Sequence, residues 1–128
     1  LLLEFRDTAP ATLDRLARAV DEIVAAESAR RPVDLAVTET ADIAPVDMDP
    51  ALGDIIAEAA RSHGEDPMIM PSGAGHDAMV MARHLPGAML FVPSIGGRSH
   101  DTAEDTPPED IVLGCRVLAS AVAAVLGR

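Results

Sequence analysis

The 128-residue sequence contains no lysine, no tryptophan and no tyrosine, and it has only two phenylalanines. Its ten basic residues are therefore all arginines, against 21 acidic residues, which gives a formal net charge of −11. A nucleic-acid interface needs a basic face that neutralises phosphates, and an anionic membrane surface attracts the same kind of face. Neither nucleic acid nor a membrane is therefore an expected partner.

Cysteine is equally scarce, because Cys115 is the single one. One cysteine excludes an internal disulfide and suits a reducing compartment, so a cytoplasmic location is expected. Cys115 lies in an apolar helical run, which predicts a buried structural thiol rather than a nucleophile. No run reaches the ~18–20 apolar residues of a membrane span. The charged residues that follow residues 1–3 do not fit a signal peptide.

The sequence is rich in aliphatic residues. Its hydrophobic fraction is 48%, which is enough to build a core. Residues 1–6 are typical of a short strand, and a sequence that begins directly in a strand is expected to be a section of a longer protein. From Pro10, apolar residues recur with the spacing of a helix that has one buried face, ending near residues 30–32. Residues 33–43 alternate apolar and polar side chains, as a half-buried strand does. Residues 1–46 are therefore expected to form a strand, a helix and a strand of an α+β unit.

Residues 44–49 are acidic, contain proline and form the expected domain boundary. The second part of the chain is residues 47–128. Asp49 followed by Pro50 is typical of a helix start, and Gly64 is typical of a helix end. The apolar stripe of this helix consists of Leu52, Ile55, Ile56 and Ala59. Apolar runs predict buried strands at residues 68–70 and 88–92, and apolar periodicity predicts helices at residues 76–84 and about 109–126. Helices that alternate with fully apolar strands imply an α/β fold whose sheet is covered on both faces.

Two glycine-rich loops follow the two expected strands of this part, at residues 72–77 and 94–101. In an open α/β sheet, sites gather beyond the carboxyl ends of the strands, so both loops are expected to meet there. The first loop leads into a helix and offers backbone amides to an anion, although a tight strand-to-helix turn also explains it. In the second loop, His100 with Ser99, Asp101 and Glu104 around it supplies a metal ligand and polar support, and His76 in the first loop is an equal candidate. A loop histidine, however, is more often only solvated.

The two loops also carry motifs of a known family. Residues 71–78 have the sequence PSGAGHDA, and residues 89–100 have the sequence MLFVPSIGGRSH, followed by Glu104 and Thr106. These motifs resemble the C-terminal signature of the hydantoinase/carbamoylase group of M20-type metallopeptidases and amidohydrolases. That group includes N-carbamoyl-L-amino-acid hydrolases, allantoate amidohydrolases and β-ureidopropionases. Residues 3–6 resemble a strand of the family's inserted dimerisation domain, so the resemblance spans nearly the whole chain.

The resemblance implies roles for individual residues. His100 would be a ligand to one of two divalent metal ions, with zinc expected before manganese or cobalt. Arg6 would bind the substrate carboxylate, a task that suits a planar guanidinium. The substrate would also contact the first loop, at Gly73, Ala74, Gly75 and His76. Supporting positions would be Asp77, Ser99 and Glu104. Arg98 departs from the family, which has isoleucine or a similar residue there.

The resemblance further implies an architecture and an activity. Residues 1–46 would end an α+β dimerisation domain, and residues 47–128 would be the C-terminal segment of a zinc-hydrolase-like αβα catalytic sandwich, in a homodimer. The complete enzyme would cleave the C–N bond of N-carbamoyl-L-amino acids, allantoate or ureidopropionate with metal-activated water. No catalytic residue is expected in this chain, because the family's general base and other metal ligands come from the N-terminal part. The isolated chain is therefore expected to be inactive.

Two alternatives stay open. The chain would fit a peptidase or aminoacylase of the same superfamily, although SGAGHDA differs from the Gly-Gly-x-Asp pattern that is usual in peptidases. It would also fit a non-catalytic module that dimerises through residues 1–6 and the first helix. Such a module should be a stable dimer that gains nothing from zinc.

Overall fold

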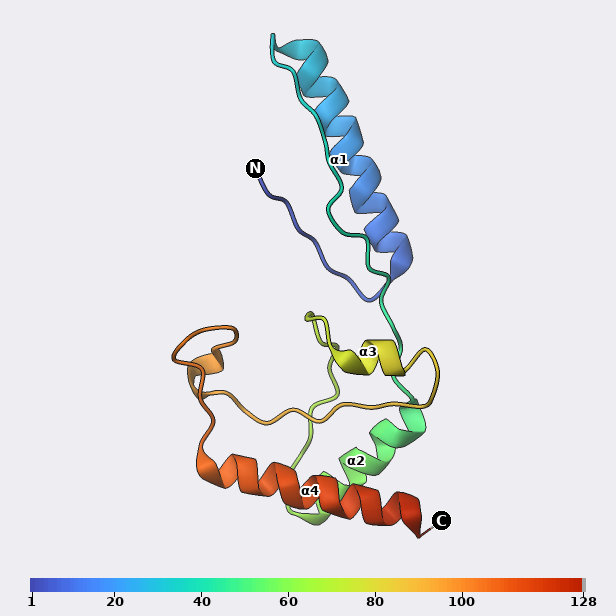
Figure 1. Ribbon diagram of the computed structural model, residues 1–128, viewed down its shortest axis with the longest axis vertical. Helices are drawn as coiled ribbons and strands as arrows, with labels where there is room; N and C mark the ends of the chain where they lie inside the picture. Colours follow the sequence, from blue (N-terminus) through green and yellow to red (C-terminus); the bar gives the residue numbers. More distant parts are fainter. Residues whose placement is uncertain (128) are drawn as a thin grey trace. The chain divides into compact units, whose positions relative to one another are not determined.

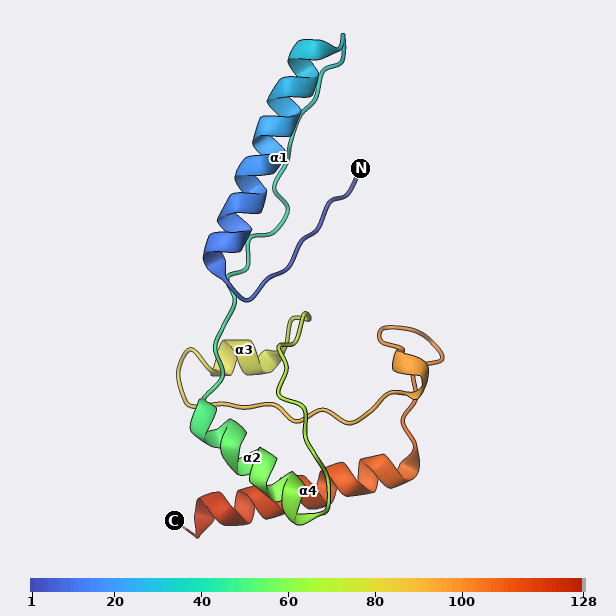
Figure 2. The same cartoon turned by 180° about the vertical axis from the view of Figure 1, so that it is seen from behind.

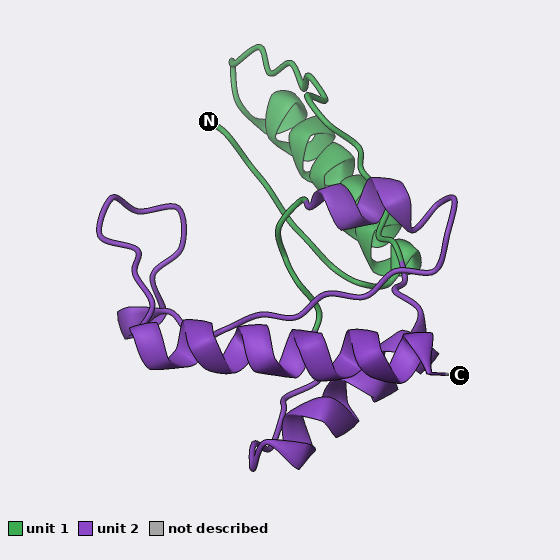
Figure 3. Cartoon of the chain, turned by 60° about the horizontal axis from the view of Figure 1, so that its bottom comes forward, with its two compact units in different colours: residues 1–46, 71–75 green, residues 47–70, 76–128 purple. Residues whose placement is uncertain are grey.

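The computed structural model describes residues 1–127, and its regular elements there are all helical (Figure 1). In chain order they are α1 (Pro10–Arg30), α2 (Pro50–Ser62), α3 (Asp77–Met81), the 3-10 helix η1 (Ile95–Gly97) and α4 (Pro108–Leu126). The contacts divide the chain into two compact units (Figure 3). Unit 1 consists of Leu1–Val46 and Pro71–Gly75, and unit 2 consists of Asp47–Met70 and His76–Arg128.

In unit 1, α1 has the bounds that the sequence predicts. Pro10 occupies the first turn, where a residue without an amide hydrogen is tolerated. The N-cap is Ala9, whose amide donates a hydrogen bond to Oδ1 of Asp7 at 2.7 Å. In the last turn Glu27 forms an ion pair with Arg30 at 2.8 Å. The apolar stripe of α1 is half-buried at Leu13, Leu16, Val20 and Val24.

The expected strands are the main correction to the sequence interpretation. None of residues 1–6, 33–43, 68–70 and 88–92 is a strand. Figures 1 and 2 show the segment after α1 running back alongside that helix as an extended chain. A strand requires a ladder of hydrogen bonds to a neighbour as well as an extended backbone, and these segments have no such ladder within residues 1–127. The sheet predicted from the apolar runs is therefore not formed by the described part of the chain.

The prediction for both ends of α2 is confirmed. Asp49 is the N-cap, and its carboxylate accepts a hydrogen bond from Leu52 N at 2.9 Å. At the other end Gly64 has a φ of +89°, a conformation that glycine adopts without a steric penalty. The amide of Glu65 then donates to the carbonyl oxygen of Ala60 at 3.1 Å, the long hydrogen bond of a Schellman ending.

The core of unit 2 forms where α2 packs against α4. Its buried members are Ile55, Ala59, Ala60, Val117 and Ala121. Leu52 and Ile56 pack against this cluster, so the predicted stripe of α2 is confirmed. A hydrogen bond of 3.0 Å between His63 Nε2 and Ser120 Oγ also joins the two helices.

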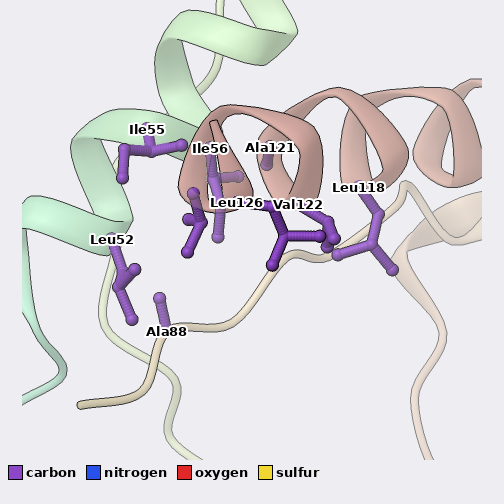
Figure 4. Close-up of a pocket in the computed structure, with 9 residues that line it drawn as sticks. Leu52, Ile55, Ile56, Ala88, Leu118, Ala121, Val122 and Leu126 are labelled. Atoms are coloured by element: carbon purple, nitrogen blue, oxygen red, sulfur yellow. The ribbon is translucent and has the colours of Figure 1, made fainter. Parts of the chain in front are cut away.

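α4 is apolar around most of its circumference, so its sequence does not reveal which face meets α2. The face that does so contains Leu113, Val117 and Ala121. Cys115 lies off that face and is exposed, so the prediction of a buried thiol is wrong. A neighbouring face of α4 borders an open cavity of about 200 Å³ (Figure 4). The cavity is lined by the aliphatic residues Leu52, Ile55, Ile56, Ala88, Leu118, Ala121, Val122, Val125 and Leu126.

The chain exposes more surface than a compact domain of its size. Its accessible area is 10052 Å², whereas a folded monomer of this mass exposes about 6,400 Å². Residues 68–70, which were predicted to be a buried strand, are between 62% and 80% exposed. The prediction that residues 68–70 are buried is therefore wrong. Within residues 1–127 no helix has the length and apolarity needed to cross a membrane.

Gly114 marks the place where α4 meets the extended segment 88–92. A Cβ atom at this position would lie 2.6 Å from Cγ1 of Val92, well inside the packing distance of two carbons. We expect Gly114→Ala to lower the free energy of unfolding by up to about 2 kcal/mol, because an overpacking cost of about 1–3 kcal/mol offsets the ~1 kcal/mol gain in helix propensity. Urea unfolding curves of the two proteins measure this difference.

The matched background for this substitution is Val92→Ala, which removes the methyl group that Cβ would meet. In that background Gly114→Ala should be neutral or stabilising, since alanine favours a helix over glycine. A stabilising Gly114→Ala with Val92 still present would show that α4 does not approach the segment this closely.

Candidate functional site

Arg6 joins the N-terminal segment of unit 1 to the first glycine-rich loop. Its Nη1 donates a hydrogen bond to the carbonyl oxygen of Gly73, 67 residues further along the chain. A Cβ atom at Gly73 would lie 3.9 Å from Cδ of Arg6, so the arginine side chain lies directly against the loop. Two residues that the family resemblance assigns to the substrate are therefore neighbours.

Glu4 contacts another edge of the same guanidinium. Its Oε1 accepts a hydrogen bond from Arg6 Nε at 2.7 Å and lies 2.5 Å from Nη2. Both side chains stay more than half exposed, at 61% for Glu4 and 57% for Arg6. The resemblance at residues 3–6 includes Glu4 but assigns it no role, although a spacing of two residues in an extended segment places both side chains on one face. That spacing is the signal by which the pair could have been found.

The first glycine-rich loop leads into a very short helix. Within the loop, Ser72 Oγ accepts a hydrogen bond from Ala74 N at 3.3 Å. His76 is the N-cap of α3, and α3 has only five residues, beginning at Asp77. So short a helix contributes little dipole to an anion site. The ring of His76 packs against Phe91 in unit 2, with their centroids 5.5 Å apart.

The second glycine-rich loop is held by hydrogen bonds among its own residues. Ser94 Oγ donates to the carbonyl oxygen of Arg98 at 2.5 Å. The amide of His100 donates to Oε2 of Glu104 at 2.7 Å, and the φ of His100 is +55°. This left-handed conformation is uncommon for a residue other than glycine, and the contact with Glu104 stabilises it. Glu104 therefore supports the loop through the backbone of His100.

Arg98 and Asp101 face each other across the turn that contains Ser99 and His100. Nη1 of Arg98 lies 3.7 Å from Oδ1 of Asp101, and both side chains are about half exposed. An exposed ion pair of this length contributes little stability. Asp101 also accepts a hydrogen bond from Ala103 N at 2.8 Å, so its carboxylate mainly closes the turn.

His100 is the metal ligand that the family resemblance implies, and the residues around it do not complete a site. Within residues 1–127, no group of three or more His, Cys, Asp and Glu side chains is placed to hold a metal ion. Zinc in proteins takes three or four protein ligands. The donors among the described residues therefore do not form a complete metal centre, and the role of His100 as a ligand stays a prediction.

The structure brings some of the expected site residues together and not others. Arg6 and Gly73 meet within unit 1. Ser99, His100 and Glu104 share one loop of unit 2. The expectation that the two glycine-rich loops line one site stays a prediction.

Known families and structures match most of the chain. The sequence profile of peptidase family M20/M25/M40 matches residues 7–124. Among solved structures, an amidase of the hydantoinase/carbamoylase family from Burkholderia phymatum is similar with a TM-score of 0.83 and 40% sequence identity. That similarity covers 96% of this chain and 29% of the amidase.

Two relatives are similar in sequence over a shorter stretch. The allantoate amidohydrolase of Bacillus subtilis is 43% identical over 82 residues, which are 64% of this chain and 20% of the relative. The N-carbamoyl-L-amino-acid amidohydrolase of Rhizobium meliloti is 42% identical over 78 residues, 61% of this chain and 19% of the relative. The chain therefore spans less than a third of the length of each of these proteins.

Proposed function

Because the chain belongs to peptidase family M20/M25/M40, we propose that it is the C-terminal portion of an amidohydrolase that acts on N-carbamoyl-L-amino acids or related ureido compounds. Family membership makes the full-length protein a hydrolase. The relatives named for allantoate and for N-carbamoyl-L-amino acids favour cleavage of a carbamoyl or ureido C–N bond over other amide bonds. The expected substrate also carries a carboxylate.

The observation that carries this proposal is the contact between Arg6 and Gly73. A guanidinium binds a carboxylate through strong charge-assisted hydrogen bonds. Beside it, the small residues Gly73, Ala74 and Gly75 let the backbone approach a ligand closely. The contact therefore supports a site in unit 1 in which Arg6 binds the carboxylate and the loop at residues 73–75 contacts the rest of the substrate. The family resemblance separately assigns His76 to the substrate and Asp77 to a supporting position.

Amidohydrolases of the M20 family are generally dependent on divalent metals. We assign two such ions to the complete enzyme, zinc first and manganese or cobalt as alternatives, with His100 as one ligand and Ser99 and Glu104 supporting its loop. The remaining ligands and the catalytic residues would come from outside this sequence, because the described residues do not gather a metal site. The enzyme would act in the cytoplasm as a homodimer, with residues 1–46 in a dimerisation domain and residues 47–128 in the catalytic domain.

The proposal is tested on the purified natural protein that carries this sequence. We expect an intact mass several-fold above 13.3 kDa, close to two metal ions per chain by elemental analysis, and hydrolysis of N-carbamoyl-L-alanine or allantoate. The 128-residue chain alone is expected to bind no stoichiometric zinc and to hydrolyse neither compound, because one histidine cannot hold two metal ions.

Two other outcomes would replace the proposal. Turnover of dipeptides or N-acyl amino acids in place of carbamoyl compounds would identify a peptidase or aminoacylase of the same family. A natural protein of 13.3 kDa that contains no metal, forms a stable dimer and keeps the same melting temperature with zinc would be a non-catalytic dimerisation module.

A further inference from the structure

The Arg6 guanidinium is contacted from two sides, although its side chain is 57% exposed. An arginine has five N–H donors in a rigid planar fork. Oε1 of Glu4 contacts the edge of the guanidinium formed by Nε and Nη2. The carbonyl oxygen of Gly73 accepts a hydrogen bond from Nη1. The two hydrogen bonds use the N–H of Nε and one N–H of Nη1, and Nη2 adds an ion-pair contact with Glu4. Nη1 and Nη2 therefore each keep at least one N–H that these contacts do not use. A carboxylate that binds a guanidinium end-on uses one N–H of each of these two nitrogens.

Neither stability nor charge explains why an acidic residue stands beside this arginine. Glu4 and Arg6 are both more than half exposed, and ion pairs of this kind contribute little to folding. A second carboxylate near a carboxylate-binding site also repels an anionic substrate. What the pair does supply is orientation, because an unrestrained arginine loses much side-chain freedom when it binds a ligand.

We propose that Glu4 is a positioning residue that orients the Arg6 guanidinium for end-on binding of the substrate carboxylate. This inference rests on the proposed function of Arg6. Glu4 fixes one edge of the guanidinium and Gly73 a second, so that the arginine is preorganised against the loop before the substrate arrives.

The test is a kinetic comparison in the complete enzyme. We expect Glu4→Ala to raise KM for an N-carbamoyl-L-amino acid about five- to tenfold, with kcat within about twofold, because it weakens only the binding of the carboxylate. Glu4→Gln, which keeps an acceptor oxygen without the charge, should have a KM between those of the wild type and Glu4→Ala. For the corresponding N-carbamoyl amino acid amide, which lacks the carboxylate, the KM of the Glu4→Ala enzyme should equal that of the wild type.

A double-mutant cycle separates orientation from a general structural role. In the background of Arg6→Ala, Glu4→Ala should have no further effect on KM, since there is no guanidinium left to orient. Glu22→Ala, at an exposed position on α1 of the same unit, is the matched control and should leave KM unchanged.

The outcomes distinguish a failure of the positioning role of Glu4 from a failure of the proposed function. An unchanged KM in Glu4→Ala, or an equal rise in the presence and absence of Arg6, overturns the positioning role while the proposed function stands. A wild-type enzyme that hydrolyses no carbamoyl or ureido substrate overturns the proposed function, and the role of Glu4 with it.

Discussion

Replacing His100 with alanine is expected to lower kcat of the complete enzyme by more than about 100-fold, beyond the 10- to 100-fold loss that removal of an outer-shell partner of a metal causes. We propose His100 as a direct metal ligand, so elemental analysis should also show the loss of about one metal ion per chain. The metal measurement is independent of activity, and it therefore reports on the ligand role alone.

The backbone at His100 requires a second variant. Its φ of +55° lies in the left-handed region, where alanine is strained but asparagine is tolerated. His100→Asn should therefore preserve the loop and still lose metal and activity. His84→Ala, at an exposed position after α3, is the control for removal of an imidazole and should retain both. Full metal content in both His100 variants would contradict the ligand assignment.

Replacing Arg6 with alanine is expected to raise KM for an N-carbamoyl-L-amino acid about 10- to 100-fold, because hydrogen bonds to a charged group are worth about 1.5–3 kcal/mol. The effect on kcat should be small, since the carboxylate lies away from the bond that breaks and is bound equally in the ground and transition states. Initial rates over a range of substrate concentrations separate the two constants.

The charge and the shape of Arg6 can be tested apart. Arg6→Lys keeps the charge but loses the planar fork, so its KM should lie between those of the wild type and Arg6→Ala. Arg31→Ala removes an exposed arginine that pairs with Glu27 at the end of α1 and should leave KM unchanged. An Arg6→Ala enzyme that loses kcat with an unaltered KM would place the arginine elsewhere in the reaction.

Local signals were sufficient for α1, α2 and α4 and for the motifs, whereas α3 ends at Met81, three residues before the predicted end at residue 84. Asp49 and Gly64 bound α2 as predicted, because a cap acts on backbone groups within four or five residues of itself. Pro10 likewise begins α1. The loops that carry His76 and His100 were located by their glycine content, and the family match over residues 7–124 confirms the resemblance that they suggested.

The site was only partly predictable. Arg6 and Gly73 were each named, but their contact was not, because 67 residues separate them and no periodic pattern links them. The spacing of two residues between Glu4 and Arg6 indicates that their side chains share a face, but Glu4 was not predicted as a site residue. The contact of Glu104 with the backbone amide of His100, rather than with its ring, also depends on a turn geometry that the sequence does not display.

The sequence by itself determined the bounds of α1 and α2, the apolar stripe of α2 and the family, because each depends on residues close together in the chain. The tertiary structure decided which face of α4 packs on α2, that Cys115 is exposed, and that the apolar runs at residues 68–70 and 88–92 form no strand within the described chain. The physical reason is the same in all three cases. Burial and strand pairing are properties of a residue together with a partner, and an apolar run specifies the need for a partner without supplying one.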